Sequence, residues 1–89
     1  MTSQMIRCFE VLCETRNFTK AAERLYISQS SLSKQLKNLE AELDCQLIDR
    51  TQTPIAPTPA GIRFQEYCHR VERLRRDLME DLRPYQRCP

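Results

Sequence analysis

Tryptophan is absent from this sequence of 89 residues, and histidine and glycine each occur only once. The single histidine, His69, lies beside arginines, with no acid–base pair and no metal-ligand spacing around it. We therefore interpret His69 as a solvated helix residue. We predict that the protein is not an enzyme and has no catalytic site, no metal site and no cofactor. A small-molecule site is not expected in this chain either.

Long apolar runs are missing too. None approaches the roughly 18 residues that a membrane span requires, and the N-terminus lacks the profile of a signal peptide. We expect a cytoplasmic protein with no membrane partner, in which cysteines stay reduced. The cysteines are five in number, an odd count without CxxC spacing, which argues against a disulfide framework or a zinc site. Cys8 and Cys13 are expected to pack as small hydrophobic side chains rather than to act as redox sensors; the others are Cys45, Cys68 and Cys88.

The net charge is only +2, which permits nucleic-acid binding without requiring it. Basic residues gather late in the chain, at Arg63, Arg70, Arg73, Arg75 and Arg76. This cluster is either an ordinary solvated helix face or a contact for a nucleic-acid backbone. We favour the solvated face, because basic residues are common on exposed helices.

Hydrophobic spacing predicts one mainly α domain. The first helix is expected from Ser3, its N-cap, to about residue 14, and a short second helix from the N-cap Thr19 to about residue 25. The third is expected from the N-cap Ser28 to about residue 43. Its leucines form one buried stripe: Leu32, Leu36, Leu39 and Leu43.

The helical period stops between residues 45 and 58. Two short strands, 45–48 and 53–57, are expected around a turn at 49–52, with Pro54 and Pro57 restricting the second strand to an edge position. Such a hairpin is called a wing. Thr58 and Pro59 are a good N-cap and first helical residue, and the helix that they begin should run to about residue 83, where Pro84 ends it.

This last helix should be about 40 Å long, which is more than the core of so short a chain can cover. Its apolar residues follow a near-heptad spacing. An uncovered apolar stripe needs another helix, and the simplest partner is a second copy of the chain. We therefore predict a homodimer through Phe64, Tyr67, Val71, Leu74, Leu78 and Leu82.

Residues 18–40 give a short helix, a tight turn and a longer helix with a polar outer face. This helix-turn-helix arrangement suits the major groove of DNA. A glutamine such as Gln29 can read adenine, and Lys34 can reach guanine or the backbone. On the pattern alone, an ordinary solvated helix face remains the alternative.

The same stretch resembles the N-terminal winged helix-turn-helix domain of the LysR-type transcriptional regulators. The resemblance extends in order over about residues 5–83. It rests on Phe18-Thr19, Ala21 to Leu25, Ser28-Gln29, Leu32 to Leu36, Leu39-Glu40, Glu42-Leu43, Leu47, Arg50 and Thr58 to Gly61.

The resemblance implies a winged helix-turn-helix domain in residues 1–58, a linker helix that pairs antiparallel with its twin in 59–83, and a tail in 84–89. The third helix becomes the recognition helix. The positions that would face double-stranded DNA are Thr19, Lys20, Gln29, Ser30, Ser33, Lys34, Lys37 and Arg50.

Several residues depart from the family pattern. Ser30 replaces the usual proline, which leaves the start of the recognition helix less fixed, and Asp44 replaces the glycine that commonly ends it. Ile48 stands where an aromatic residue is common. The wing residues 51–54 include no basic side chain, so we expect weak wing contacts, with either weaker affinity for DNA or more reliance on the third helix.

Full members of this family continue into an effector-binding domain, so the chain is expected to be either a DNA-binding fragment or a stand-alone short regulator. The predicted function is a transcription regulator that binds an interrupted inverted repeat as a dimer. The alternative is a protein-interaction module that dimerises with a full-length relative and modulates it without reading DNA.

Overall fold

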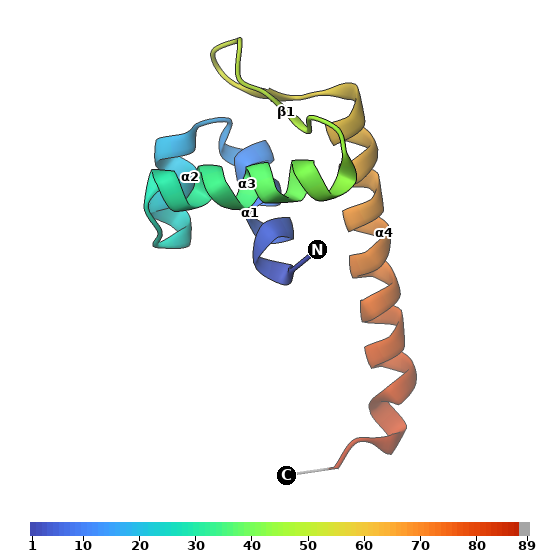
Figure 1. Cartoon of the computed structure of the whole chain (residues 1–89). Helices are drawn as coiled ribbons and strands as arrows, with labels where there is room; N and C mark the ends of the chain where they lie inside the picture. Colours follow the sequence, from blue (N-terminus) through green and yellow to red (C-terminus); the bar gives the residue numbers. More distant parts are fainter. Residues whose placement is uncertain (88–89) are drawn as a thin grey trace.

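The computed structural model describes residues 1–87, so Cys88 and the end of the predicted tail lie outside the described residues. Helices α1 (Ser3–Thr15), α2 (Phe18–Leu25) and α3 (Gln29–Leu43) pack into a head. A hairpin of β1 (Ile48–Asp49) and β2 (Ala56–Pro57) follows, and then α4 (Pro59–Leu82), which ends in a 3-10 turn at Arg83–Tyr85 (Figure 1). The predicted mainly α winged helix-turn-helix fold is confirmed.

The core of the head forms around the leucine stripe of α3. Leu32, Leu36 and Leu39 are fully buried, as predicted, and Leu43 packs at the edge of the core. α1 contributes Phe9 and Leu12, and α2 contributes two alanines. Because an alanine side chain is a single methyl group, α2 can lie close against its neighbours.

The N-caps of the first two helices differ from the prediction. Thr2 caps α1 by accepting the amide of Met5 (3.1 Å), and Asn17 caps α2 by accepting the amide of Lys20 (2.9 Å). Ser3 therefore lies inside α1, and Thr19 inside α2. Asparagine is as strong an N-cap as serine, and the two choices lie within the usual uncertainty of helix ends.

The other two N-caps are as predicted. Ser28 accepts the amide of Ser31 (3.1 Å) at the start of α3. Thr58 accepts the amide of Gly61 (3.0 Å) at the start of α4, with Pro59 as the first helical residue. Both side chains satisfy a backbone amide that a helix cannot bond internally.

The first three helices all end on a left-handed residue, and none of these residues is glycine. They are Arg16, Tyr26 and Asp44, with φ angles of 51°, 57° and 54°. Asp44 thus takes the conformation that a glycine would adopt more readily. Its amide bonds to the α3 carbonyls, which closes the end of the helix.

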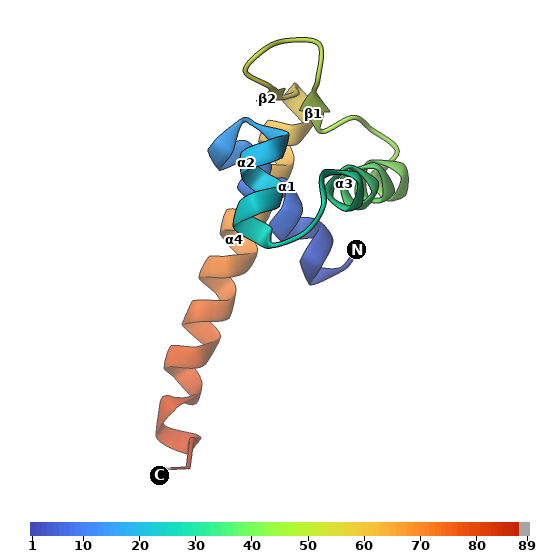
Figure 2. The same cartoon turned by 90° about the vertical axis from the view of Figure 1, so that its left-hand side faces the viewer.

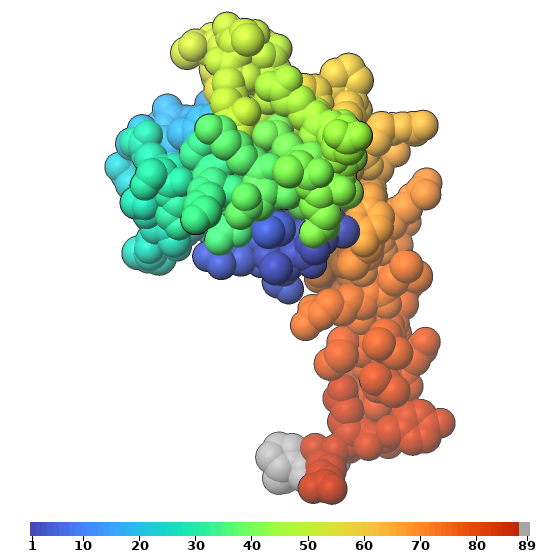
Figure 3. Space-filling view, in the orientation of Figure 1, coloured from blue at the N-terminus to red at the C-terminus, as the bar shows by residue number. Residues whose placement is uncertain are grey.

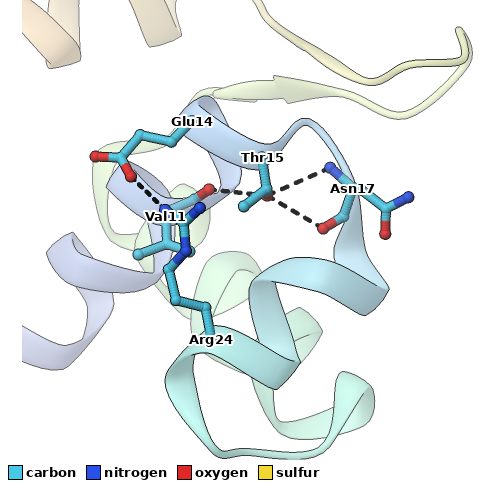
Figure 4. A network of polar contacts seen from close by, with 5 residues as sticks. All are labelled: Val11, Glu14, Thr15, Asn17 and Arg24. Atoms are coloured by element: carbon cyan, nitrogen blue, oxygen red, sulfur yellow. Dashed lines mark hydrogen bonds and ion pairs between the residues drawn. The ribbon is translucent and has the colours of Figure 1, made fainter.

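The turn between α1 and α2 is held by side chains as well (Figure 4). The hydroxyl of Thr15 lies 2.9 Å from the carbonyl oxygen of Val11 and 3.4 Å from the amide nitrogen of Asn17. Arg24 of α2 forms an ion pair with Glu14 of α1. These contacts fix the angle at which the chain enters α2.

The wing is shorter than the sequence predicts. Ile48 pairs with Pro57 and Asp49 with Ala56 in an antiparallel ladder, and the remaining residues of the predicted strands lie outside the ladder. Asp49 turns the chain, because its carboxylate accepts hydrogen bonds from the amide (2.9 Å) and the hydroxyl (2.6 Å) of Thr51. These bonds compete with further pairing along the strand.

The start of α4 completes the head. Phe64 is only 8% exposed and packs edge-on against Phe9 with ring centroids 5.1 Å apart, and Cys68 is buried beside it. Phe64, predicted to lie in the dimer stripe, is therefore part of the core of a single chain. Phe64 has the same helical spacing as the other residues of the predicted dimer stripe, but it lies at the end of α4 that the head covers.

The rest of α4 projects away from the head. Every residue from His69 to Leu82 is exposed, and both views show this part of the helix alone (Figures 1 and 2). The radius of gyration is 15.4 Å, against about 12 Å for a compact domain of this length. Among residues 1–87, no helix combines the length and the apolar character needed to cross a membrane.

Candidate nucleic-acid interface

The outer side of α3 carries the predicted DNA-facing residues of that helix. At about 100° of rotation per residue, they fall within about 140° of one another, and this arc begins at Gln29, which borders the buried leucines beside Leu36. We name this set the recognition face: Gln29, Ser30, Ser33, Lys34 and Lys37. All are exposed except Ser33, which is half-buried. Figure 3 shows α3 lying across the head below the wing, and in Figure 2 α3 stands on the side of the head away from the lower part of α4.

The first turns of α2 and α3 lie side by side at one end of the recognition face. The side-chain nitrogen Nε2 of Gln29 donates a hydrogen bond of 2.9 Å to Oγ1 of Thr19. Ser30 lies with its hydroxyl 3.2 Å from that of Ser28, so the start of α3 is fixed by serines where the family commonly has proline. Lys20 follows Thr19 on α2 and is exposed.

Arg50 lies between the wing and the start of α2. Its Nη2 donates to Oε1 of Glu40 at 3.2 Å, and its guanidinium carbon lies 5.7 Å from the centre of the Phe18 ring. The side chain is 31% exposed, and its Nε is buried without a hydrogen-bond partner among the described residues. Part of its charge is thus already neutralised by Glu40, which leaves less of it for a phosphate than the sequence alone indicates.

Glu40 is a structural residue of this site that the sequence analysis did not single out. Its carboxylate also accepts the amides of Leu47 (2.7 Å) and Ile48 (3.3 Å), which lie beyond the end of α3. Glu40 therefore fastens α3 to the start of the wing. A sign was present in the sequence: Glu40 follows Leu36 by four residues, so it lies beside the buried stripe, at the same edge of α3 as Gln29.

The tip of the wing contributes no cation. Residues 51–54 are Thr, Gln, Thr and Pro, and all four are exposed. Hydrogen bonds from the Thr51 hydroxyl, from the Thr51 amide and from the Gln52 side chain hold the pKa of Asp49 below its usual range. The positive side chains near the recognition face are therefore those of α2, α3 and Arg50.

The cysteines are free thiols throughout the described part of the chain. Burial, with a smaller contribution from neighbouring charges, raises the pKa of Cys13 to about 12 and that of Cys68 to about 11. Burial likewise raises the pKa of Cys8. Since the thiolate is the reactive form, we expect these three thiols to react slowly, which fits the predicted packing role of Cys8 and Cys13.

Comparison with known proteins identifies the family. The family described as "Bacterial regulatory helix-turn-helix protein, lysR family" matches residues 3–62, from the start of α1 into α4. The chain belongs to the LysR family. Its helix-turn-helix is a DNA-binding domain of transcription regulators, followed by the linker helix α4, and the LysR family is not a family of enzymes.

Two curated relatives illustrate the similarity. The chain is 43% identical over 67 residues to the transcriptional regulator BenM of Acinetobacter baylyi, an alignment that covers 75% of this chain and 22% of BenM. It is 46% identical over 70 residues to a probable RuBisCO transcriptional regulator of Phaeodactylum tricornutum, covering 79% of this chain and 23% of the relative. The chain thus spans less than a quarter of the length of these two regulators.

Solved structures agree in fold as well as in sequence. The DNA-binding domain of BenM in complex with benA site 1 DNA matches with a TM-score of 0.85 and 34% identity, over 97% of this chain and 100% of that one. The CbnR DNA-binding domain, also solved with DNA, matches with a TM-score of 0.83 and 31% identity, over 98% and 100%. Both matches extend over α4 as well as the head.

Proposed function

We propose that this LysR-family domain reads a specific DNA sequence as a homodimer, with α3 in the major groove. The observation that carries the proposal is the recognition face, an exposed polar surface on a helix whose other side is buried. The complexes of BenM and CbnR with DNA support it. The proposed base-reading residues are Gln29, Ser33 and Lys34, and the proposed backbone contacts are Thr19, Lys20, Ser30, Lys37 and Arg50.

We propose that the homodimer forms along α4, between Tyr67 and Leu82. Five apolar side chains there lie on one side of the helix and are 40–68% exposed, which is unfavourable in water. We call them the α4 stripe: Tyr67, Val71, Leu74, Leu78 and Leu82. A second α4 laid along this stripe would bury all five.

The charges beside the stripe favour an antiparallel pair. Arg63, Arg70 and Asp77 follow at seven-residue intervals along one edge of the stripe, and Asp81 lies on the same edge. This edge is basic towards the head and acidic towards the far end. Antiparallel packing centred near Leu74 brings this edge of the two chains together, with Arg70 of one beside Asp77 of the other. In a parallel pair this edge would instead face the opposite edge of the partner helix, where Arg75 lies.

A two-fold dimer requires a binding site of matching symmetry. The two recognition faces of an antiparallel dimer point to separate half-sites, so we expect an inverted repeat with unread base pairs between the halves. With a neutral wing tip, the sequence preference should be confined to the base pairs that α3 can reach.

Selection from a pool of random DNA duplexes at physiological salt tests whether the domain binds DNA sequence-specifically. Enrichment of a sequence with dyad symmetry, lost or relaxed at one position in Gln29→Ala, is the expected result. If a folded, dimeric protein enriches nothing, the proposal is wrong. The alternative would then be favoured, namely that the α4 stripe pairs with a longer relative and that the domain modulates it without reading DNA.

Leu74→Glu tests the dimer contact separately. Leu74 is 68% exposed in one chain, so the variant should fold but sediment as a monomer. Ile62→Glu is the matched control: Ile62 is 49% exposed and lies on the opposite side of α4 by helical rotation. A Leu74→Glu protein that remains as dimeric as Ile62→Glu would contradict the proposed interface.

A further inference from the structure

We propose that Thr19 is a positioning residue for base reading: it holds the side-chain amide of Gln29 in the orientation that meets the base. The inference rests on the proposed function, and the hydrogen bond between Gln29 Nε2 and Thr19 Oγ1 (2.9 Å) carries it. This bond joins the first turn of α2 to the first residue of α3, and both side chains are exposed on the side proposed to face DNA.

The Thr19 hydroxyl is free for this task because another residue caps α2. Asn17 accepts the Lys20 amide, so the hydroxyl of Thr19 has no capping bond to make. It lies instead beside α3, where it meets Gln29. Had Thr19 been the N-cap of α2, as the sequence predicted, its hydroxyl would have been used at the end of that helix and not beside Gln29.

Hydrogen-bond accounting shows that Gln29 can bond to Thr19 and still read a base. A glutamine amide has two N–H donors and one carbonyl oxygen. Thr19 takes one donor of Gln29. The other donor and the oxygen are the pair that a bidentate contact with N7 and N6 of adenine uses. Thr19 keeps its own O–H proton, which can be donated to a phosphate oxygen.

Pre-organisation is the physical advantage of this arrangement. A free glutamine on an exposed helix end samples many rotamers, and fixing one of them on binding has an entropic cost. The bond to Thr19 restricts the amide before DNA arrives, so less freedom is lost in the complex. It also sets which way the amide plane faces, and this orientation decides whether adenine or another base satisfies it.

A simple phosphate contact by Thr19 predicts something different. Phosphate contacts carry no direct sequence information, so losing one weakens binding to every duplex alike. A positioning role instead predicts a loss confined to the base pair that Gln29 reads. Discrimination at that base pair, and not overall affinity, is therefore the quantity to measure.

The experiment first identifies the base pair at which Gln29→Ala loses the preference of the wild-type protein. It then compares binding to the duplex that the wild-type protein enriches with binding to the three duplexes substituted at this base pair. Thr19→Val has nearly the same shape but no hydroxyl, and Thr19→Ser keeps the hydroxyl. We expect Thr19→Val to lower discrimination at this base pair about twofold to tenfold, the range that one neutral hydrogen bond gives, and Thr19→Ser to keep it. In a Gln29→Ala background, Thr19→Val should change discrimination no further.

Lys20→Ala is the control for a backbone contact, since loss of a phosphate-binding lysine should weaken all duplexes uniformly. Thermal unfolding of Thr19→Val checks the fold, and we expect it to match that of the wild-type protein because the side chain of Thr19 is exposed. If Thr19→Val behaves like Lys20→Ala, with discrimination unchanged, the inference is overturned while the proposed function stands. If the wild-type protein enriches no sequence at all, the proposed function and this inference fail together.

Discussion

Glu40→Ala should destabilise the head more than Glu42→Ala, which removes the other carboxylate of α3. The Glu40 side chain is 11% exposed and accepts the amides of Leu47 and Ile48 as well as the guanidinium of Arg50. Leu47 and Ile48 are themselves 1% and 0% exposed, so water has little access to replace the lost acceptor. The substitution leaves two buried amides and one partly buried cation without their partner.

The magnitude follows from the cost of such groups. A buried donor that loses its partner costs about 1–3 kcal/mol. The ion pair adds less than the roughly 3–5 kcal/mol of a fully buried pair, because Arg50 is 31% exposed and water reaches it. Since the losses at the two amides overlap, we expect Glu40→Ala to lower the free energy of unfolding by about 2–4 kcal/mol. That is a sizeable part of the roughly 5–15 kcal/mol of a typical domain, and it corresponds to a drop in Tm of about 8 °C or more.

Urea denaturation followed by circular dichroism measures this loss, at one fixed protein concentration because dimerisation adds to apparent stability. Glu42→Ala is the control on the same helix: Glu42 is exposed, so the change should stay within about 0.5 kcal/mol. Glu40→Gln, which keeps one acceptor oxygen but loses the charge, should fall between the two. A Glu40→Ala protein as stable as Glu42→Ala would refute the anchoring role of Glu40.

Three further predictions concern packing and the thiols. Gly61→Ala should destabilise the fold by about 1–3 kcal/mol in urea denaturation, because a Cβ there would overlap with the backbone carbonyl of Leu47; a stabilised variant would contradict this close approach. At pH 8, iodoacetamide should label the exposed Cys45 in the native protein well before Cys13 and Cys68, as followed by peptide mass spectrometry; equal rates would show that the last two are not protected. Since the folded protein raises the pKa of Cys13 from 9.0 to about 12 and that of Cys68 to about 11, it keeps protons that the unfolded chain loses, so the free energy of unfolding should fall as the pH rises above about 9. The fall should be smaller in a Cys13→Ala/Cys68→Ala variant, and an unchanged slope would contradict this assignment.

Local signals in the sequence were enough to predict most of the elements. The leucine stripe of α3 and the N-caps Ser28 and Thr58 lie where the sequence predicts them, because each depends only on residues within the same helix or next to it. The shared side of the recognition face follows from the same helical period. The N-cap of α2 was misplaced by two residues, from Asn17 to Thr19, since both residue types are good caps and only the backbone conformation separates them.

Only the tertiary structure decided which of these side chains meet. The sequence places Phe64 in the same stripe as Leu74, but α1 covers the first and leaves the second exposed. Glu40 lies in the last turn of α3, where the helix dipole disfavours a negative charge, yet folding brings the amides at the start of the wing to its carboxylate. The periodicity of a helix gives the direction of each side chain about its own axis. It carries no information on the neighbouring element that the side chain will face, and that depends on how distant parts of the chain pack together.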